Sequence, residues 1–389
     1  MAKPKLALVP AAQGSKFYSV LPSSGVGDFT FSRSGSATRI NSQGLIETVG
    51  NGVSRLNYPL IDGVVSGCPH HILEPSSTNL ITYSEDFSQW SALSGVVVTD
   101  NFAISPNGTQ NASKLVFDGT TNGRIERYVT ASGTNTQSVY LKTESGTQNV
   151  SIGVGSADLT EFTITDQWVR YTHTGVGNYP RILCNDAATI YAWGCQYESG
   201  SYATSYIPTS GSTYQRQSDV VNGSGNSEVF NDSEGVLFAD IAALADDGTS
   251  RRISLTDVSG STFLNLVSIE LDESSGILKA FVSDNIDIGI LQGNIIQTQY
   301  NKIALKYNAS SISLYVNGFE LDSNNTPNLP SGLKILDFNN GQSNQTSELY
   351  GKTKEVGYYD AALTDSELEY LTSYRSLNEL VTELNLNTL

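Results

Sequence analysis

The stretch YAWGCQYESG places Cys195 three residues before Glu198, a pairing that would suit a thiol nucleophile beside an acid. A thiol nucleophile needs a base to activate it, and the chain has histidines only at positions 70, 71 and 173. His173 falls in the alternating stretch WVRYTHTG, where we expect it to have no acidic neighbour. A cysteine inside an apolar strand is usually a small core residue. The sequence therefore predicts that Cys195 packs in a core and is not catalytic.

The sequence has one cluster of residues that could bind a soft metal ion, Cys68-Pro69-His70-His71. A zinc site needs a fourth ligand and paired spacing, and no second cluster of Cys or His exists. The run 245–248, Ala-Asp-Asp-Gly, offers oxygen ligands for a structural calcium, but its spacing matches no known calcium loop. We predict no metal and no cofactor. The three cysteines are too few for a disulfide framework, so we expect Cys184 and Cys195 to be reduced.

The carboxylates closest to a catalytic pair are Glu270 and Asp272 in SIELDESSG. Glycoside hydrolases flank the scissile bond with two acids, and alternate residues of a strand share one face. Positions 274 and 275, where a third acid would complete such a set, are both Ser. We therefore predict a protein that is not an enzyme, and a glycosidase or polysaccharide depolymerase is the alternative.

The elements that would position these residues are strands. Only 16% of the 389 residues are charged and 39% are hydrophobic, a balance typical of all-β modules with polar loops. The formal charge of −17, with no basic run, excludes nucleic acid and anionic membrane surfaces as partners. No stretch approaches the ~20 apolar residues of a membrane span, so we predict no membrane insertion.

Period-two alternation divides the chain. Strand-like segments recur across residues 81–209 and again across 228–375, which predicts two jelly-roll or lectin-like β-sandwiches in tandem. Residues 1–80 have many turns and little periodicity, so we expect an extended arm that lies against another subunit or protein. Residues 210–227 are rich in Ser and Gly and follow Pro208, which predicts a linker.

Two short sequence patterns predict particular local structures, a hairpin turn and helix N-termini. Asn317-Gly318 suits the two positive φ angles of a type I′ turn and predicts a hairpin. Thr364 with Glu367 forms a capping box, and Ser376 with Glu379 forms another before a helix over 376–389. Such a short helix must bury its apolar stripe on its own domain or on a partner chain.

Three stretches together resemble virion proteins of tailed bacteriophages: FSRSGSATRINSQGLIETV, GCPHHILEPSSTNLITYSEDFSQW and YAWGCQYESGSYATSYIPTSGSTYQRQSD. His70 and His71 depart from that pattern. The residues at motif positions, for which the resemblance implies architectural roles, are Ala37, Thr38, Arg39, Leu73, Glu74, Pro75, Thr78, Asn79, Leu80, Trp193, Gly194 and Gln196.

The resemblance implies a sandwich similar to carbohydrate-binding modules, then a concanavalin-like or laminin-G-like lectin domain. It implies a structural protein of the virion, in a tail fibre, spike, collar or head fibre, synthesised in the host cytoplasm. Its expected partners are other virion proteins, further copies of itself, with a trimer favoured, and host-surface glycans. A purely architectural decoration protein is a further alternative. Sugars stack on aromatic rings, and we expect contacts from Tyr202, Tyr206, Tyr358 and Tyr359, whereas Trp90, Trp168 and Trp193 are assigned to cores.

Overall fold

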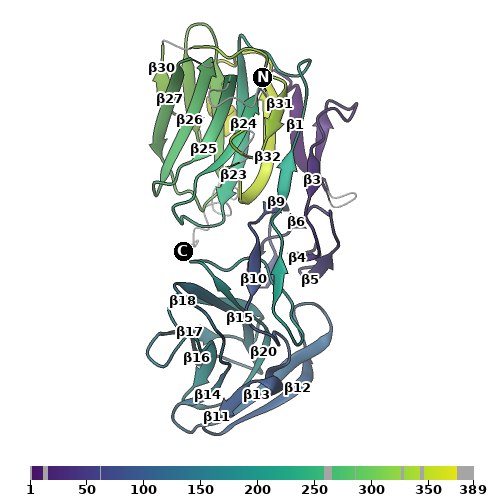
Figure 1. Cartoon of the computed structure of the whole chain (residues 1–389), viewed down its shortest axis with the longest axis vertical. Helices are drawn as coiled ribbons and strands as arrows, with labels where there is room; N and C mark the ends of the chain where they lie inside the picture. Colours follow the sequence, from purple (N-terminus) through teal and green to yellow (C-terminus); the bar gives the residue numbers. More distant parts are fainter. Residues whose placement is uncertain are drawn as a thin grey trace.

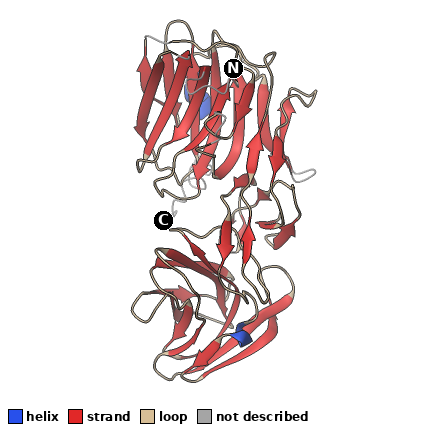
Figure 2. Ribbon diagram, in the orientation of Figure 1, coloured by secondary structure: helices blue, strands red, loops and turns tan. Residues whose placement is uncertain are grey.

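Two β-sandwiches lie end to end along the long axis of the molecule and meet at a narrower junction (Figure 1). The structure is a computed structural model and describes residues 2–11, 16–61, 63–257, 265–284, 286–325, 328–341 and 346–374. Antiparallel strands dominate it, with one short 3-10 helix and one α-helix among the described residues (Figure 2). The all-β prediction is confirmed.

The first sandwich consists of two five-stranded antiparallel sheets. One sheet has the order β12 (Val96–Ile104), β13 (Gln110–Asp118), β20 (Ala187–Ser199), β15 (Asn135–Thr143) and β18 (Val169–Gly175). The other has the order β11 (Ser91–Leu93), β14 (Gly123–Glu126), β19 (Arg181–Cys184), β16 (Gln148–Gly153) and β17 (Leu159–Ile164). The 3-10 helix η1 (Phe87–Gln89) precedes them. Their inward residues, such as Leu115, Val139 and Ile190, form one buried core.

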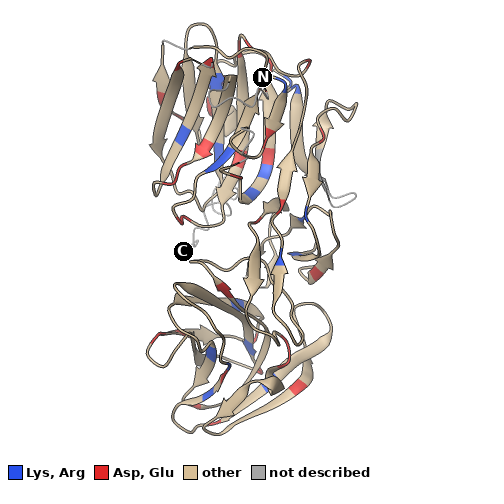
Figure 3. Ribbon diagram, in the orientation of Figure 1, with Lys and Arg blue, Asp and Glu red and all other residues tan. Residues whose placement is uncertain are grey.

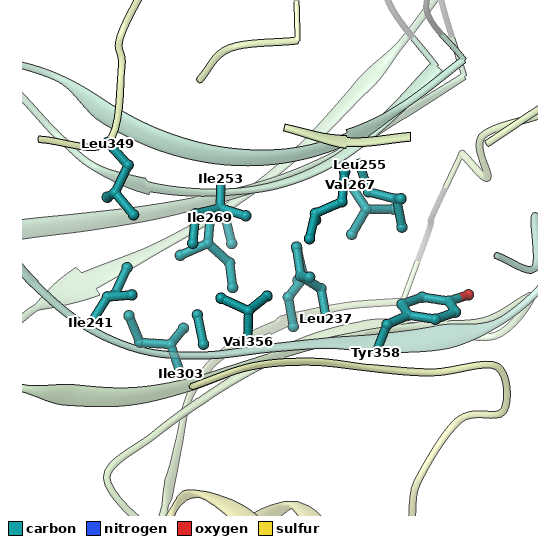
Figure 4. Close-up of a cluster of buried hydrophobic side chains, with 14 of the residues drawn as sticks. Leu237, Ile241, Ile253, Leu255, Val267, Ile269, Ile303, Leu349, Val356 and Tyr358 are labelled. Carbon is teal, nitrogen blue, oxygen red and sulfur yellow. The ribbon is translucent and has the colours of Figure 1, made fainter. Parts of the chain in front are cut away.

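In the second sandwich, a longer sheet packs face to face against a five-stranded sheet. The longer sheet runs β2 (Lys16–Leu21), β1 (Leu6–Ala11), β32 (Gly351–Tyr359), β23 (Gly235–Ala243), β28 (Asn301–Tyr307), β29 (Ile312–Val316) and β30 (Phe319–Asn324). Opposite it lie β27 (Ile288–Asn294), β26 (Ile277–Asp284), β25 (Asn265–Leu271), β24 (Arg251–Thr256) and β31 (Ile335–Asp337). Leu237, Ile303 and Val356 of one sheet point toward Ile253 and Ile269 of the other (Figure 4).

The N-terminal segment packs on its own chain. Leu6 and Leu8 of β1 are fully buried in the core of the second sandwich. This differs from the expectation of an arm that lies against another subunit, because β1 pairs with β32 and the alternation of Leu6 and Leu8 turns both inward.

Short strand pairs join the rest of this segment to distant parts of the chain. β6 (Leu56–Asn57) pairs with β9 (His70–Leu73), and β9 extends the longer sheet beside β32. The residues predicted as a linker supply two strands, β21 (Tyr214–Arg216) and β22 (Val220–Asn222), whose partners are β10 (Ser77–Asn79) and β3 (Thr30–Ser32). Two local hairpins complete the segment, β4 (Ala37–Ile40) with β5 (Ile46–Val49) and β7 (Leu60–Ile61) with β8 (Val64–Val65). The exact domain boundaries stay predictions.

Both sharp local predictions are confirmed where the structure describes them. Asn317 and Gly318 have φ values of 52° and 93° and connect β29 to β30. Thr364 caps α1 (Asp365–Thr372) in a complete capping box with Glu367, and α1 packs on the outer face of the longer sheet. The helix predicted over 376–389 lies outside the described residues. In the described ranges, no helix has the length and apolar character needed to cross a membrane.

Candidate functional site

Five buried ionisable side chains form an ion network where the N-terminal segment meets the segment 203–224 that leaves the first sandwich. Asp219 accepts hydrogen bonds from Arg33 Nη1 at 2.9 Å and from Arg55 Nη2. Glu74 Oε2 lies 2.7 Å from Arg55 Nη1 and 3.6 Å from Arg216 Nη1. We call these five residues the junction network; charges of both signs lie between the sandwiches in Figure 3.

The junction network holds together segments that are far apart in sequence. Arg33 and Asp219 are 186 residues apart, and all five side chains are at most 2% exposed. Burial alone would raise the pKa of Glu74, but the guanidinium groups of Arg216 and Arg55 hold it well below its ordinary value. The lowered pKa keeps Glu74 ionised, and removal of one of its cations would leave a buried charge without its partner.

Two histidines beside the network are neutral. Burial lowers the pKa of His71 to about 3 and also lowers that of His70 well below its ordinary value. His70 Nε2 lies 3.3 Å from the Asn57 amide nitrogen. Cys68 is exposed whereas both histidines are buried, so the three side chains do not converge on one site.

The motif residues surround the exit from the first sandwich. Thr38 Oγ1 donates to the Tyr206 carbonyl at 2.5 Å. Asn79 donates to the Ile207 carbonyl at 2.8 Å and accepts from the Tyr197 amide at 3.1 Å. Gln196 Oε1 accepts from the Ile207 amide at 2.6 Å. These side chains fix the backbone of residues 206–207 against β10, β4 and β20.

Most of the remaining motif residues pack against neighbouring side chains. Gly194 has a φ of 64°, and a Cβ there would lie 3.2 Å from the Tyr206 ring. Arg39 pairs with Glu47 across the β4–β5 hairpin at 2.6 Å. Three of the others, namely Ala37, Leu73 and Trp193, are buried, and Pro75, Thr78 and Leu80 are half-buried.

The candidate nucleophile is enclosed. Cys195 is fully buried, and burial raises the pKa of its thiol to about 12. The expectation for His173 was wrong in one respect: Asp158 Oδ1 lies 3.1 Å from its Nε2, because β17 and β18 bring them together. Gln137 of β15 lies between His173 and Cys195: it is the cross-strand partner of His173, and its side-chain amide lies 3.9 Å from Cys195 Sγ.

Each carboxylate of the alternative catalytic pair has its own cation. Glu270 lies 2.6 Å from Arg252, and Asp272 lies 2.6 Å from Lys279. Burial would raise the pKa of Asp272, but hydrogen bonds from Lys279 and Ser274 hold it below its ordinary value. A general acid needs a raised pKa, so this arrangement does not favour hydrolysis. The turn at Asp247 is likewise neutralised, by Arg251 at 2.7 Å.

Three of the four tyrosines predicted to contact sugars are buried, and that prediction is wrong for them. Tyr206 is 3% exposed and bonds Ser84 and Glu85 through its hydroxyl group. Tyr358 is fully buried, and Tyr359 packs under α1. Tyr202 is half-buried, and burial raises the pKa of its hydroxyl group to about 12. Alternation could not identify Tyr358 and Tyr359 as buried, since both faces of the longer sheet are covered at β32.

A row of alternating aromatic and lysine side chains crosses the outer face of the first sandwich. Strand register places Lys114 of β13, Tyr191 of β20 and Lys142 of β15 side by side. Phe102 extends the row at one end and Trp168 at the other. We call these five residues the aromatic–lysine row.

The lysines lie over the rings. Lys114 Nζ is 4.6 Å from the Phe102 ring centre, and Lys142 Nζ is 5.5 Å from that of Tyr191 and 5.6 Å from that of Trp168. Phe102 is 45% exposed, Trp168 is half-exposed, and Tyr191 is shielded beneath its neighbours. Trp90 and Trp193 are buried as expected, whereas Trp168 is on the outer face. In the sequence, the alternation around Lys114 and Lys142 indicated that both lysines point outward. No pattern around Phe102 indicated that it belongs to the same row.

Comparison with known proteins gives structural similarity to parts of several solved structures, each at low sequence identity. No family model matches the chain, and no curated protein matches its sequence. The CBM40 domain of the Ruminococcus gnavus IT-sialidase is 13% identical, with a TM-score of 0.34 over 39% of this chain and 94% of that one. A heptameric SAP-like pentraxin from Limulus polyphemus is 13% identical, with a TM-score of 0.28 over 37% of this chain and 71% of the pentraxin. The LamAcat domain from Zobellia galactanivorans is 17% identical, with a TM-score of 0.25 over 39% of this chain and 73% of that one.

Proposed function

We propose that this protein is a non-enzymatic adhesion component of a virion, which binds surface glycans through the aromatic–lysine row. The observation that carries the glycan-binding proposal is the alternation of rings and ammonium groups along one row of an open sheet face. Aromatic rings accept the apolar face of a sugar, and ammonium groups donate hydrogen bonds to its hydroxyl oxygens. Phe102 supplies the most exposed ring of the row.

The virion assignment is supported by the three sequence motifs and by the role of their residues at the junction. A stiff connection between two sandwiches suits a part that must project binding faces from a particle. Glycan contacts of this kind are individually weak, and several copies on one particle would raise the avidity. We therefore also propose that the protein acts as a homo-oligomer, with a trimer expected.

The test of glycan binding compares Phe102→Ala with Phe319→Ala. Phe319 is 75% exposed on the second sandwich and serves as a matched control for loss of an exposed ring. Retention of the oligomeric protein on immobilised host polysaccharide should fall severalfold for Phe102→Ala only. Equal retention of both variants and the unmodified protein would exclude the aromatic–lysine row as the binding face.

Two further measurements test the rest of the proposal. Reducing sugar released from the same polysaccharide would contradict a non-enzymatic role and would favour a depolymerase. A monomer by light scattering at micromolar concentration would contradict the proposed oligomer. Density for this chain on an intact particle would place it in a tail or a head, and its absence from purified particles would refute the virion role.

A further inference from the structure

A pocket of about 200 Å³ lies at the junction, beside the junction network. The β4–β5 hairpin, the strands β15 and β18, the exit segment 203–206 and β32 all contribute to its walls. It is therefore lined by both sandwiches and by the N-terminal segment. Its volume corresponds to about seven water molecules at ~30 Å³ each, which is comparable with one sugar ring.

The first sandwich contributes a guanidinium group without a carboxylate partner. Arg170 donates to the Thr204 carbonyl at 2.7 Å and to Ser138 Oγ at 2.8 Å, and it lies 5.6 Å from the centre of the Tyr140 ring. Its Nε is buried without a hydrogen-bond partner, and no acidic side chain in the described ranges pairs with it. The side chain is thus held in place while its charge is not neutralised.

The second sandwich contributes an ammonium group that also lacks a carboxylate partner among the described residues. Lys352 of β32 is half-buried, and within the described part of the chain its ammonium group has neither a hydrogen bond nor an ion pair. Burial lowers its pKa, and the charge of Lys354 acts in the same direction, against the attraction of Glu74. Glu74 itself is engaged by Arg55 and Arg216.

The charges that line the pocket therefore do not balance. Arg39 is paired with Glu47, and Glu74 belongs to the junction network. Arg170 and Lys352 remain, so two positive charges face one small pocket in a chain of formal charge −17. Half-buried cations cost free energy unless an anion compensates them.

We propose that this pocket binds the carboxylate of an acidic sugar, a hexuronic acid unit of a glycan, between Arg170 and Lys352. The remaining walls suit a sugar better than a bare anion. Tyr140, Ile40 and Leu244 present apolar surface to ring C–H groups, and Asn57 provides an amide for a hydroxyl group. The ligand class rests on the proposed function, because only a glycan-binding protein would meet such a unit.

The experiment measures binding of three probes to the full chain by calorimetry and by the side-chain Nε–H signals of its arginines. The probes are glucuronic acid, glucose as its neutral counterpart, and inorganic phosphate. We expect glucuronic acid to bind at least about tenfold more tightly than either of the others, since a charge-assisted hydrogen bond contributes about 1.5–3 kcal/mol. It should also shift the Nε–H signal that disappears in Arg170→Lys.

Variants locate the site. Lys352→Met removes the ammonium group, keeps an unbranched side chain only one atom shorter, and should weaken glucuronic acid binding by about tenfold or more. Lys334→Met removes one exposed lysine of the same sandwich and should leave binding unchanged. Phosphate binding as tight as that of glucuronic acid would overturn the sugar assignment, and equal binding of glucose would overturn the role of the carboxylate.

The outcomes separate this proposal from the preceding one. Unchanged affinity in Lys352→Met, or an Arg170 signal that no probe shifts, would refute the pocket even if the protein adheres to polysaccharide. Conversely, Phe102→Ala should impair adhesion to polysaccharide without changing the affinity for glucuronic acid. If Lys352→Met does not fold, the Arg170 signal of the unmodified protein alone decides the outcome.

Discussion

The junction and the second sandwich are ordered by different physical means. Between the sheets of the second sandwich lie aliphatic side chains such as Ile269 and Val356, whose burial is favourable without any directional partner. At the junction, Arg55 and Glu74 are equally buried but interact through directional charge pairs. The comparison teaches that a segment poor in apolar periodicity can still be ordered within its own chain, provided that its charges find partners.

Breaking the junction network should give the largest effect. Arg55→Met leaves Glu74 and Asp219 buried with fewer cations, and loss of a buried ion-pair partner costs about 3–5 kcal/mol. Denaturant unfolding followed by tryptophan fluorescence checks this free energy of unfolding. A loss below about 1 kcal/mol would mean that water compensates the network, as at an exposed ion pair.

Truncation in the apolar core should cost less. Ile269→Ala removes buried methyl groups between the two sheets of the second sandwich, at about 2–4 kcal/mol. Denaturant unfolding followed by far-UV circular dichroism measures it, because all three tryptophans belong to the first sandwich. If Ile269→Ala proves more costly than Arg55→Met, the ranking of the two regions is reversed.

Acid should act on the junction before the cores. His71 has a pKa of about 3 in the folded protein against 6.5 ordinarily, so its neutral form favours folding fully above pH 6.5. This contribution is lost as the pH falls from 6.5 toward 3, by about 2–3 kcal/mol at pH 4.5. His71→Phe should flatten the slope of stability against pH in this window. An unchanged slope would show that other groups bind the protons.

Glu348, a carboxyl group with no ion-pair partner among the described residues, should show the opposite sign and the smallest effect. Burial raises the pKa of Glu348 to about 7, and nearby Asp337 adds to the shift. Its protonated form is favoured on folding, so the contribution is complete below pH 4.5 and is lost as the pH rises to 7. Glu348→Gln should gain about 1 kcal/mol at pH 8, after allowance for solvent screening, and nothing at pH 4. Thermal unfolding at the two pH values measures this difference.

Sequence patterns predicted local elements well and long-range assembly poorly. The strand containing Lys114 and Leu115 and the turn at Asn317 follow from neighbours in the chain, and both are present. The edge strands β12 and β27 were not predicted, because polar residues interrupt one and two glycines interrupt the other. Tyr359 was wrongly predicted to be exposed, since the outer face that α1 covers has the same alternation as an exposed one.

The sequence by itself determined the all-β class, the strand periodicity, the hairpin turn and the helix cap, since each depends on residues within a few positions of one another. Only the tertiary structure decided that the N-terminal segment folds back on its own chain and that Arg170 and Lys352 face one pocket. Those contacts join residues more than a hundred positions apart. Their ion pairs and hydrogen bonds have no local period that a linear pattern could carry.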